Sequence, residues 1–350
     1  MMPELPRLVT GPWTLAQLSA GEVGAPKHGL RVFSCFHCGG GSTMGYKLAG
    51  FDVIGGVEID PEMMAIYRKN HSPMHSYLEG VQTFKNRNDL PEELFDLDVL
   101  DGSPPCSSFS MAGSREDAWG DKKKFREGQA EQVLDDLFFD FIDIAKRLQP
   151  RVVIAENVKG LIIGNARGYV KMIFDRFRGA GYETQLFLFN SSRMGVPQAR
   201  ERTFFVARRS SLNMEKISPV FDEPVISALT AFIGTSDHGA KPASEKAAKY
   251  WSRTKAGGLF SVCGASTGKM NRRLDPKRPA WTQTATKNLF HWERARYLSP
   301  SEAVRIQSFP DDFDFAGHDA GYVCGMSVPP LMMQRVATEV ARTLLSASPR

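Results

Sequence analysis

Long apolar runs are missing from this 350-residue chain. The longest, such as 152–155 and 186–189, fall far short of the roughly 20 residues that a membrane-spanning helix needs. Cysteine is scarce as well, and five scattered cysteines do not make a disulfide framework in a chain of this size. The first residues lack the basic stretch and apolar core of a secretory signal. We therefore expect a soluble protein of the reducing cytoplasm that has no membrane partner.

A strong charge of either sign is absent too, since 44 basic and 39 acidic residues give a net charge of +5. With 42% hydrophobic and 24% charged residues, the composition excludes disordered, collagen-like and coiled-coil chains. The basic excess is concentrated in 241–296, where thirteen basic residues stand against three acidic ones. This pattern is typical of a surface that binds a polyanion, and an ordinary solvated surface is the alternative. Aromatic residues are interleaved in the same segment: Tyr250, Trp251, Phe260, Trp281, Phe290 and Trp292.

Short β-prone runs alternate with helical periodicity from residue 30 to about 209. This alternation predicts a doubly wound, mostly parallel α/β sheet. Beyond Arg209 it stops until Ser299, where an N-cap residue followed by Pro300 begins a helix. We therefore divide the chain into an N-terminal extension (1–29), a large α/β domain (30–209), a smaller irregular domain (210–297) and C-terminal helices that return to the large domain (298–350). The expected strands are 30–36, 53–59, 97–100, 152–156, 184–190 and 203–207.

A glycine-rich turn, 36–41, follows the first expected strand. Glycines let the backbone approach a ligand closely, and an acid about 20 residues later can bind ribose hydroxyls. Glu58, near the end of the second strand, lies 19 residues after Gly39. This spacing indicates a nucleotide-type cofactor site, and a plain tight turn is the alternative.

Reactive side chains follow three later strands. Cys106 comes after two prolines and the strand 97–100, at the strand end where open α/β sheets bind ligands. Glu156 ends the next strand, and Arg200 and Arg202 share one face of an extended segment. The pattern predicts one crevice that holds a thiol, a carboxyl group and two guanidinium groups. The alternatives are a buried filler cysteine and ordinary surface charge.

In their order and spacing these motifs resemble those of the DNA (cytosine-5) methyltransferases of bacterial and phage restriction-modification systems. The resemblance spans roughly residues 30 to 340. It implies an S-adenosylmethionine-dependent methyltransferase fold in which 210–297 is the target-recognition domain. The matching elements are the turn 36–41, Pro105-Cys106 with Phe109-Ser110, Glu156-Asn157-Val158, Gln198-x-Arg200-x-Arg202, Leu298-Ser299-Pro300, Gln307-Ser308-Phe309-Pro310 and 325–330.

The resemblance implies an enzyme that transfers a methyl group from S-adenosylmethionine to C5 of a cytosine in a short DNA sequence. Cys106 would add to C6 as the nucleophile and so make C5 reactive. Glu156 would protonate N3, and Arg202 would hold O2. Arg200 and Gln198 would order the pocket and the loop that carries the thiol.

The implied cofactor is S-adenosylmethionine. No metal is expected, because Cys35 and Cys38 form a Cys-x-x-Cys pair that has no second pair to complete a zinc site. The residues that the resemblance places around the cofactor are Phe36, Gly39, Gly40, Gly41, Glu58, Ile59, Pro105, Ser327 and Val328.

A cytosine inside a duplex is out of reach, so the target base is expected to be flipped out of the helix. The segment 107–128, with three glycines and three successive lysines, is the expected clamping loop. The segment 210–271 is the expected variable part of the recognition domain, although nothing in it identifies the DNA sequence that is read. Double-stranded DNA is the expected partner of a monomeric, nucleoid-associated enzyme, and a cognate restriction endonuclease is a further one.

Three positions depart from the family pattern. Cys38 replaces the usual first glycine of the turn, Met326 replaces an asparagine, and 79–80 stand where an acid usually meets the adenine. These changes concern cofactor affinity more than the type of reaction. Two alternatives stay open: an RNA (tRNA) cytosine-5 methyltransferase, and a catalytically silent DNA-binding module of the same fold. An amino-methyltransferase is disfavoured, because Cys106 takes the place of the aromatic residue in its Ser-Pro-Pro-Tyr element.

Overall fold

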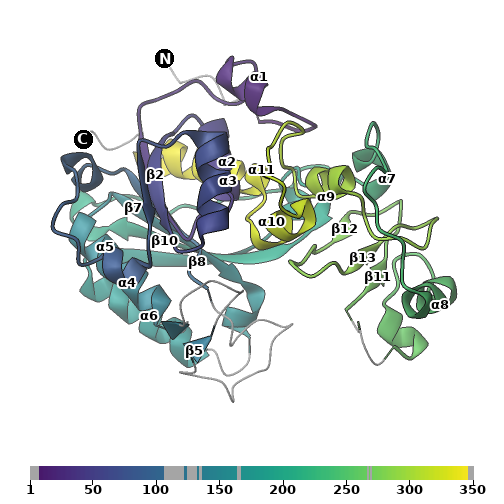
Figure 1. The fold of residues 1–350 in the computed structure, drawn as a ribbon. Helices are drawn as coiled ribbons and strands as arrows, with labels where there is room; N and C mark the ends of the chain where they lie inside the picture. Colours follow the sequence, from purple (N-terminus) through teal and green to yellow (C-terminus); the bar gives the residue numbers. More distant parts are fainter. Residues whose placement is uncertain are drawn as a thin grey trace.

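A seven-stranded sheet forms the centre of the large domain (Figure 1). The computed structural model describes residues 8–105, 122–123, 132–133, 136–163, 167–265, 268 and 270–345. The strand order is β3 (His75–Leu78), β2 (Asp52–Glu58), β1 (Arg31–Cys35), β4 (Val99–Gly102), β7 (Val152–Val158), β10 (Glu201–Arg209) and β8 (Tyr182–Asn190). Strand β10 runs antiparallel to β7 and β8, and the other neighbouring strands of this sheet are parallel. The expected mostly parallel, doubly wound sheet is thereby confirmed.

The direction in which the sheet grows reverses beside β1. From β1 the chain builds through β2 to β3, whereas β4 lies on the other side of β1 and is followed by β7. Such a reversal leaves a crevice at the carboxyl ends of the two central strands, where open α/β sheets bind ligands. The turn 36–41 and the segment 103–105 both leave the sheet at this crevice.

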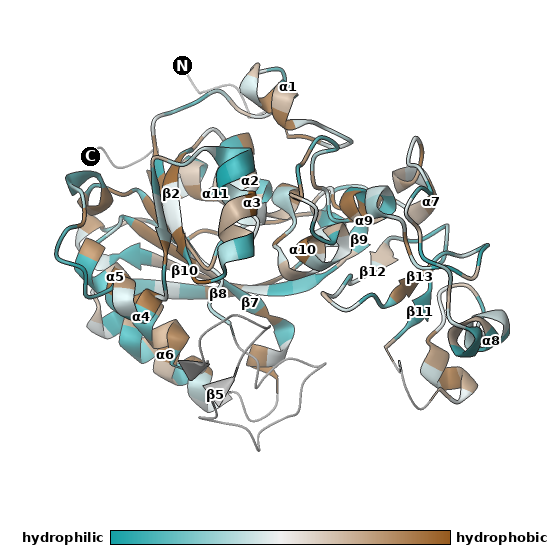
Figure 2. Ribbon diagram, in the orientation of Figure 1, coloured by the Kyte–Doolittle hydropathy of each residue, from teal (hydrophilic) through white to brown (hydrophobic). Residues whose placement is uncertain are grey.

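Helices cover both faces of the sheet. One face packs against α2 (Gly41–Leu48), α3 (Pro61–His71) and α11 (Pro330–Val340), and the other against α4 (Val81–Phe84), α5 (Leu137–Leu148) and α6 (Arg167–Gly179). The strands serve both cores by alternation: Val152 and Ile154 point to the first, Val153 and Ala155 to the second. In Figure 2, α5 and α6 show apolar and polar residues together, as helices with one face on a sheet should.

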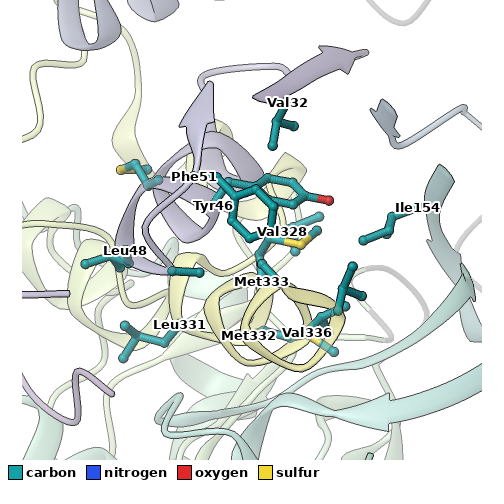
Figure 3. Packing of buried hydrophobic residues seen from close by; sticks show 14 of the residues in the cluster. Val32, Tyr46, Leu48, Phe51, Ile154, Val328, Leu331, Met332, Met333 and Val336 are labelled. Atoms are coloured by element: carbon teal, nitrogen blue, oxygen red, sulfur yellow. The ribbon is translucent and has the colours of Figure 1, made fainter. Parts of the chain in front are cut away.

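The last long helix completes the core that the first strand begins. Helix α11 packs against α2, and Figure 3 shows Met333 of α11 near Tyr46 of α2, in one cluster with Met332 and Val336. Gly45 allows this close approach, because a Cβ there would lie 2.5 Å from the Met333 Cβ and 2.6 Å from the Pro330 carbonyl oxygen. Residues almost 300 positions apart in sequence thus share one core.

The residues between the large domain and α9 (Pro300–Ile306) form shorter elements around two small cores. Strand β12 (Ala280–Trp281) pairs in parallel with β9 (Gln198–Ala199), which joins this region to the strand that follows, β10. The capping box of Ser299 and Glu302 at the start of α9 confirms the helix start read from the sequence. The other elements of this region are α7 (Ala228–Ala231), α8 (Glu245–Arg253), β11 (Arg272–Arg273) and β13 (Leu289–Phe290).

The N-terminal segment lies against the C-terminal helices. Trp13 is 1% exposed, and its Nε1 donates to the Ser308 carbonyl oxygen at 3.0 Å. The carboxylate of Asp312 accepts from the backbone N–H groups at the start of α1 (Leu15–Ser19), at 2.6 and 3.1 Å. The extension 1–29 is therefore, over its described part, a strap between the two ends of the chain.

Remaining elements are short. In the part of the chain that the structure describes, no helix is long and apolar enough to cross a membrane. The remaining pieces are α10 (Ala320–Met326), β5 (Lys122–Lys123) paired with β6 (Gln132–Val133), the 3-10 turns Glu92–Phe95, Lys159–Ile162, Ser191–Arg193, Ser210–Leu212 and Phe260–Cys263, and the π-helical turn Ala341–Leu345.

Candidate active site

Three strand ends bring the expected catalytic groups to one edge of the sheet. Glu156 lies near the end of β7, and Arg202 lies at the start of the antiparallel β10, so both reach the same edge. Asn157 donates from Nδ2 to the Pro104 carbonyl oxygen at 3.0 Å and so ties β7 to the segment that leads to Cys106. Cys106 itself lies outside the described residues, as does the expected loop 107–128 apart from its residues 122 and 123.

Glu156 and Arg202 form a buried ion pair, with 2.9 Å between Oε1 and Nε. The two side chains are only 9% and 13% exposed. Burial lowers the pKa of Arg202, while the hydrogen bond and charge of Glu156 act in the opposite direction. Both side chains line a cavity, so the pair presents a carboxyl and a guanidinium group in fixed positions to whatever enters it.

Arg200 lines the same cavity, but its guanidinium group donates its hydrogen bonds to backbone carbonyl oxygens of other segments. It donates to the carbonyl oxygens of Gln283 at 2.9 Å and Gly325 at 3.0 Å. Its buried Nε has no hydrogen-bond partner among the described residues. Burial lowers the pKa of this guanidinium well below its ordinary value. Arg200 therefore fixes the cavity wall by holding the small domain and α10 to β9.

Gln198 is fully buried and is not among the described residues that line the cavity. Its Nε2 donates to Oε1 of Gln307 at 2.7 Å and to the Ile306 carbonyl oxygen at 3.2 Å. Its Oε1 accepts from the backbone N–H of Gln283 at 3.0 Å. The sequence grouped Gln198 with the catalytic residues, and the structure places it behind them, where it joins three segments of the chain.

The cavity has a volume of about 300 Å³, at the lower end of the range for small-molecule sites. It opens between the carboxyl ends of β1, β2, β4 and β7. Four of the expected cofactor residues line it: Phe36, Glu58, Ile59 and Pro105. Further lining residues that the sequence reasoning did not assign include Asp60, Met63, Tyr322, Gly325 and Asn157. Asn157 and Gly325 lie in motifs that the sequence showed, and Asp60 is the N-cap of α3, whereas Met63 and Tyr322 reach the cavity through tertiary contacts alone.

Glu58 is held by the backbone on both sides. One carboxylate oxygen accepts from the N–H of Cys38 at 2.9 Å and the other from the N–H of Asp60 at 3.0 Å. Burial raises the pKa of Glu58. These bonds fix a carboxylate between the glycine-rich turn and the start of α3, in the wall of the cavity.

The glycines of the turn allow close packing. Gly40 adopts φ +95°, and a Cβ on it would collide with the imidazole of His71. A Cβ on Gly41 would collide with the Val328 carbonyl oxygen and lie 2.9 Å from the Ser327 Cβ. These side-chain positions therefore face protein. The remaining expected cofactor residues, Gly39, Gly40, Gly41, Ser327 and Val328, are not among the described residues that line the cavity.

The departures from the family pattern all lie in the cavity wall: Cys38, Glu79, Gly80 and Met326 line it. Cys38 adopts φ +50°, a conformation that favours glycine. Its Sγ lies 3.4 Å from the Met63 sulfur, and burial together with Glu58 raises its pKa to about 12. The thiol is therefore protonated at neutral pH. Among the described residues, no group of three or more metal-ligating side chains is found.

The family model for C-5 cytosine-specific DNA methylases matches residues 30–237 and 238–342. The type II methyltransferase M.NgoPII of Neisseria gonorrhoeae is 28% identical over 90% of this chain and 96% of its own length. The type II methyltransferase M.AplI of Arthrospira platensis is 30% identical over 90% of this chain and 86% of its own length.

Solved structures show the same fold. A prophage-encoded E. coli protein described as a DNA modification methyltransferase superimposes with a TM-score of 0.70 at 21% identity, covering 90% of this chain and 99% of that one. The DNMT2 of Spodoptera frugiperda gives a TM-score of 0.62 at 16% identity, with 89% and 99% covered. These likenesses show the fold. The family match and the curated relatives support the DNA methyltransferase interpretation rather than the RNA-methylating or silent alternatives. The chain therefore belongs to the C-5 cytosine-specific DNA methylase family and is a DNA (cytosine-5-)-methyltransferase of the restriction-modification type.

Proposed function

We propose that Cys106, Glu156 and Arg202 carry the chemistry of this enzyme on a cytosine that has been flipped out of double-stranded DNA. The observation that carries the assignment is the buried Glu156–Arg202 pair in the wall of the cavity, tied through Asn157 to the segment that leads to Cys106. Cytosine offers N3 and O2 on one edge of its ring. A carboxyl and a guanidinium group 2.9 Å apart match these two positions.

The steps follow from these positions. The Cys106 thiolate adds to C6, which turns the C5–C6 double bond into an electron-rich carbon at C5. Glu156, in its protonated form, gives a proton to N3, so that the electrons from this addition do not build up charge on the ring, and takes it back when Cys106 leaves. Arg202 donates to O2 and keeps Glu156 in place. Transfer of the methyl group and loss of the C5 proton then restore the double bond and release Cys106.

S-Adenosylmethionine, the methyl donor that methyltransferases of this family use, fits the donor set of the cavity. The carboxylate of Glu58 can accept from ribose hydroxyl groups, and Ile59 and Phe36 offer apolar contact to an adenine and a methionine chain. Pro105 closes the cavity on the side of the thiol. The packing of the turn supports this site: Gly39 and Gly41 lie against the C-terminal segment that holds Ser327 and Val328, and Gly40 lies against His71 of α3.

The DNA-binding arrangement extends this proposal. The catalytic part comprises 30–209 with the returning helices of 298–350, and 210–297 reads the duplex with its basic and aromatic side chains. Arg272 stacks over Trp281 at 3.7 Å, and Arg273 over Trp251 at 4.0 Å, which are cation–π contacts within that region. The enzyme would act as a monomer on chromosomal DNA in the cytoplasm, beside a cognate restriction endonuclease.

Bisulfite sequencing of plasmid DNA tests the proposal. Cells that express the wild-type chain should protect cytosines within one short motif, and cells that express Cys106→Ser should not, although the variant keeps its fold and cofactor binding. Methylation by the variant would overturn the role of Cys106. Unmodified plasmid from a folded wild-type protein, with modified RNA in the same cells, would overturn the duplex DNA substrate.

A further inference from the structure

Asp101 is a buried carboxyl group that the proposed reaction does not use. It lies in β4 and is 1% exposed. Its Oδ2 accepts from the Ser34 hydroxyl at 2.7 Å and its Oδ1 from the Tyr46 hydroxyl at 3.2 Å. Among the described residues, no basic side chain forms an ion pair with it. A buried acid without a cation is costly in its ionised form, so burial favours the protonated form, while the two hydroxyl donors partly offset that cost.

The register of the sheet places Asp101 directly behind the active site. Asp101 pairs with Ile154 of β7. Strand residues two apart point to the same face of a sheet. Glu156, two residues after Ile154, therefore lies on the same face as Asp101 and closer to the cavity. Ser103, two residues after Asp101, lines the cavity, and two residues of a strand span about 7 Å. The carboxyl group therefore lies within electrostatic range of the cavity without touching it.

The methyl donor and its product differ in charge at the sulfur atom. S-Adenosylmethionine carries a sulfonium cation, and its product, S-adenosylhomocysteine, carries a neutral thioether. The sulfonium has to lie next to cytosine C5, in the ring whose N3 and O2 face Glu156 and Arg202. A cation there would stabilise an ionised carboxyl group across a poorly solvated interior, where charges interact more strongly than in water.

We propose that Asp101 is a specificity-determining residue that releases its proton when the cationic cofactor occupies the cavity and keeps it when the neutral product does. The ionised carboxylate then strengthens binding of the methyl donor relative to its product. This inference rests on the proposed binding of S-adenosylmethionine in the cavity.

The surroundings allow Asp101 to titrate near neutrality. Burial, opposed by the Ser34 and Tyr46 hydrogen bonds and reinforced by the charge of Glu156, raises its pKa to about 7. The other titratable groups near it stay protonated: burial raises the pKa values of Tyr46 in α2, which bonds to it, and of Cys35 in β1, which points to the opposite face of the sheet, well above their ordinary range. Tyr67 of α3 behaves in the same way, and burial raises its pKa as well. Glu156, paired with Arg202, is the remaining charged neighbour.

Isothermal titration calorimetry counts the protons. Binding of S-adenosylmethionine and of S-adenosylhomocysteine, without DNA, would each be measured in two buffers of different ionisation enthalpy. The wild-type protein should release more protons with S-adenosylmethionine. Its affinity ratio for the two ligands should rise about fivefold between pH 6 and pH 8, the larger part of the tenfold change that one unit of pKa shift produces over the full titration.

Asp101→Asn should lose both effects, because its amide cannot ionise. Asp98→Asn is the matched control, since Asp98 lies just before the same strand at its far end and pairs with Arg151 at 2.8 Å. The ligands' own amino groups titrate alike in all three proteins, so the comparison isolates Asp101. Equal proton counts for the two ligands in the wild-type protein would overturn the inference, even if a variant failed to fold. Absence of saturable binding by the folded wild-type protein would overturn the cofactor assignment as well.

Discussion

The carboxylate of Glu156 and the guanidinium of Arg202 meet at 2.9 Å across two antiparallel strands, with little of either side chain exposed. The pair exists before any nucleic acid is bound. Removal of one partner leaves the other as a buried, uncompensated charge, whereas removal of both charges does not. This asymmetry separates the catalytic contribution of each group from its contribution to stability.

We expect Glu156→Gln to slow methyl transfer by about 100-fold or more, the usual scale for lost acid–base catalysis. Glutamine keeps a hydrogen bond to Arg202 but cannot give a proton to N3. Single-turnover transfer of a labelled methyl group to DNA measures the effect. Glu201→Gln is the control, because Glu201 pairs with Lys159 at 2.9 Å in a half-exposed position and is not among the described cavity-lining residues. A variant with normal transfer and weakened DNA binding would contradict the proton-donor role.

Arg202→Met should lower the free energy of unfolding by about 3–5 kcal/mol, because it strands the Glu156 carboxylate in a buried site. Urea unfolding at neutral pH measures this change. The double variant with Glu156→Gln should regain much of the lost stability while remaining inactive. Additive losses in the double variant would show that the two side chains are not energetically coupled.

Asp101→Asn should gain stability relative to the wild type as the pH rises. The carboxyl pKa is about 7 in the folded protein and about 3.9 in an unfolded chain. Because the folded state holds the proton over this interval, the free energy of unfolding of the wild type falls from about pH 4 to pH 7. The Asp101→Asn variant does not lose this stability, because the asparagine amide does not titrate.

Urea unfolding at pH 5 and pH 8 tests this sign. The advantage of Asp101→Asn over the wild type should grow by about 1 kcal/mol or more between the two values. Asp98→Asn removes the partner of Arg151 and should destabilise the protein at both pH values. A pH-independent difference between wild type and Asp101→Asn would mean that Asp101 is ionised throughout.

Trp13→Ala should destabilise the protein by about 3–5 kcal/mol, the usual cost of deleting a buried indole. The change removes packing and the bond to the Ser308 carbonyl oxygen. Thermal unfolding of the full chain measures it. Trp281→Ala is the comparison, since Trp281 is 38% exposed and should cost much less. Equal losses would mean that the N-terminal strap contributes little to the fold.

The parts of this site that local sequence patterns encode could be predicted from the sequence. Alternating strands and helices placed Glu156 and Arg202 at one sheet edge, because the carboxyl ends of parallel strands and the start of the antiparallel β10 coincide there. The positions of Gln198 and Arg200 could not be read in this way. Their hydrogen bonds reach residues more than 80 positions away, and no local pattern encodes such partners.

Asp101 shows a second limit. In sequence it is one polar residue among apolar neighbours in a short strand. Only the tertiary structure shows that Ser34 and Tyr46 meet its oxygens and that no basic side chain among the described residues pairs with it. The packing of residues 8–29 could not be predicted from the sequence either, because it depends on the contact of Trp13 with Ser308 near the other end of the chain.

The packing of α11 on α2 has a consequence for the timing of activity in the cell. A ribosome releases α2 long before it has made α11, so the nascent chain exposes the apolar side of α2, including Leu48, until the last helix arrives. The sheet that holds the active site cannot close over its core in that interval. We therefore expect that a chain that ends before α11 does not complete this core and does not methylate DNA.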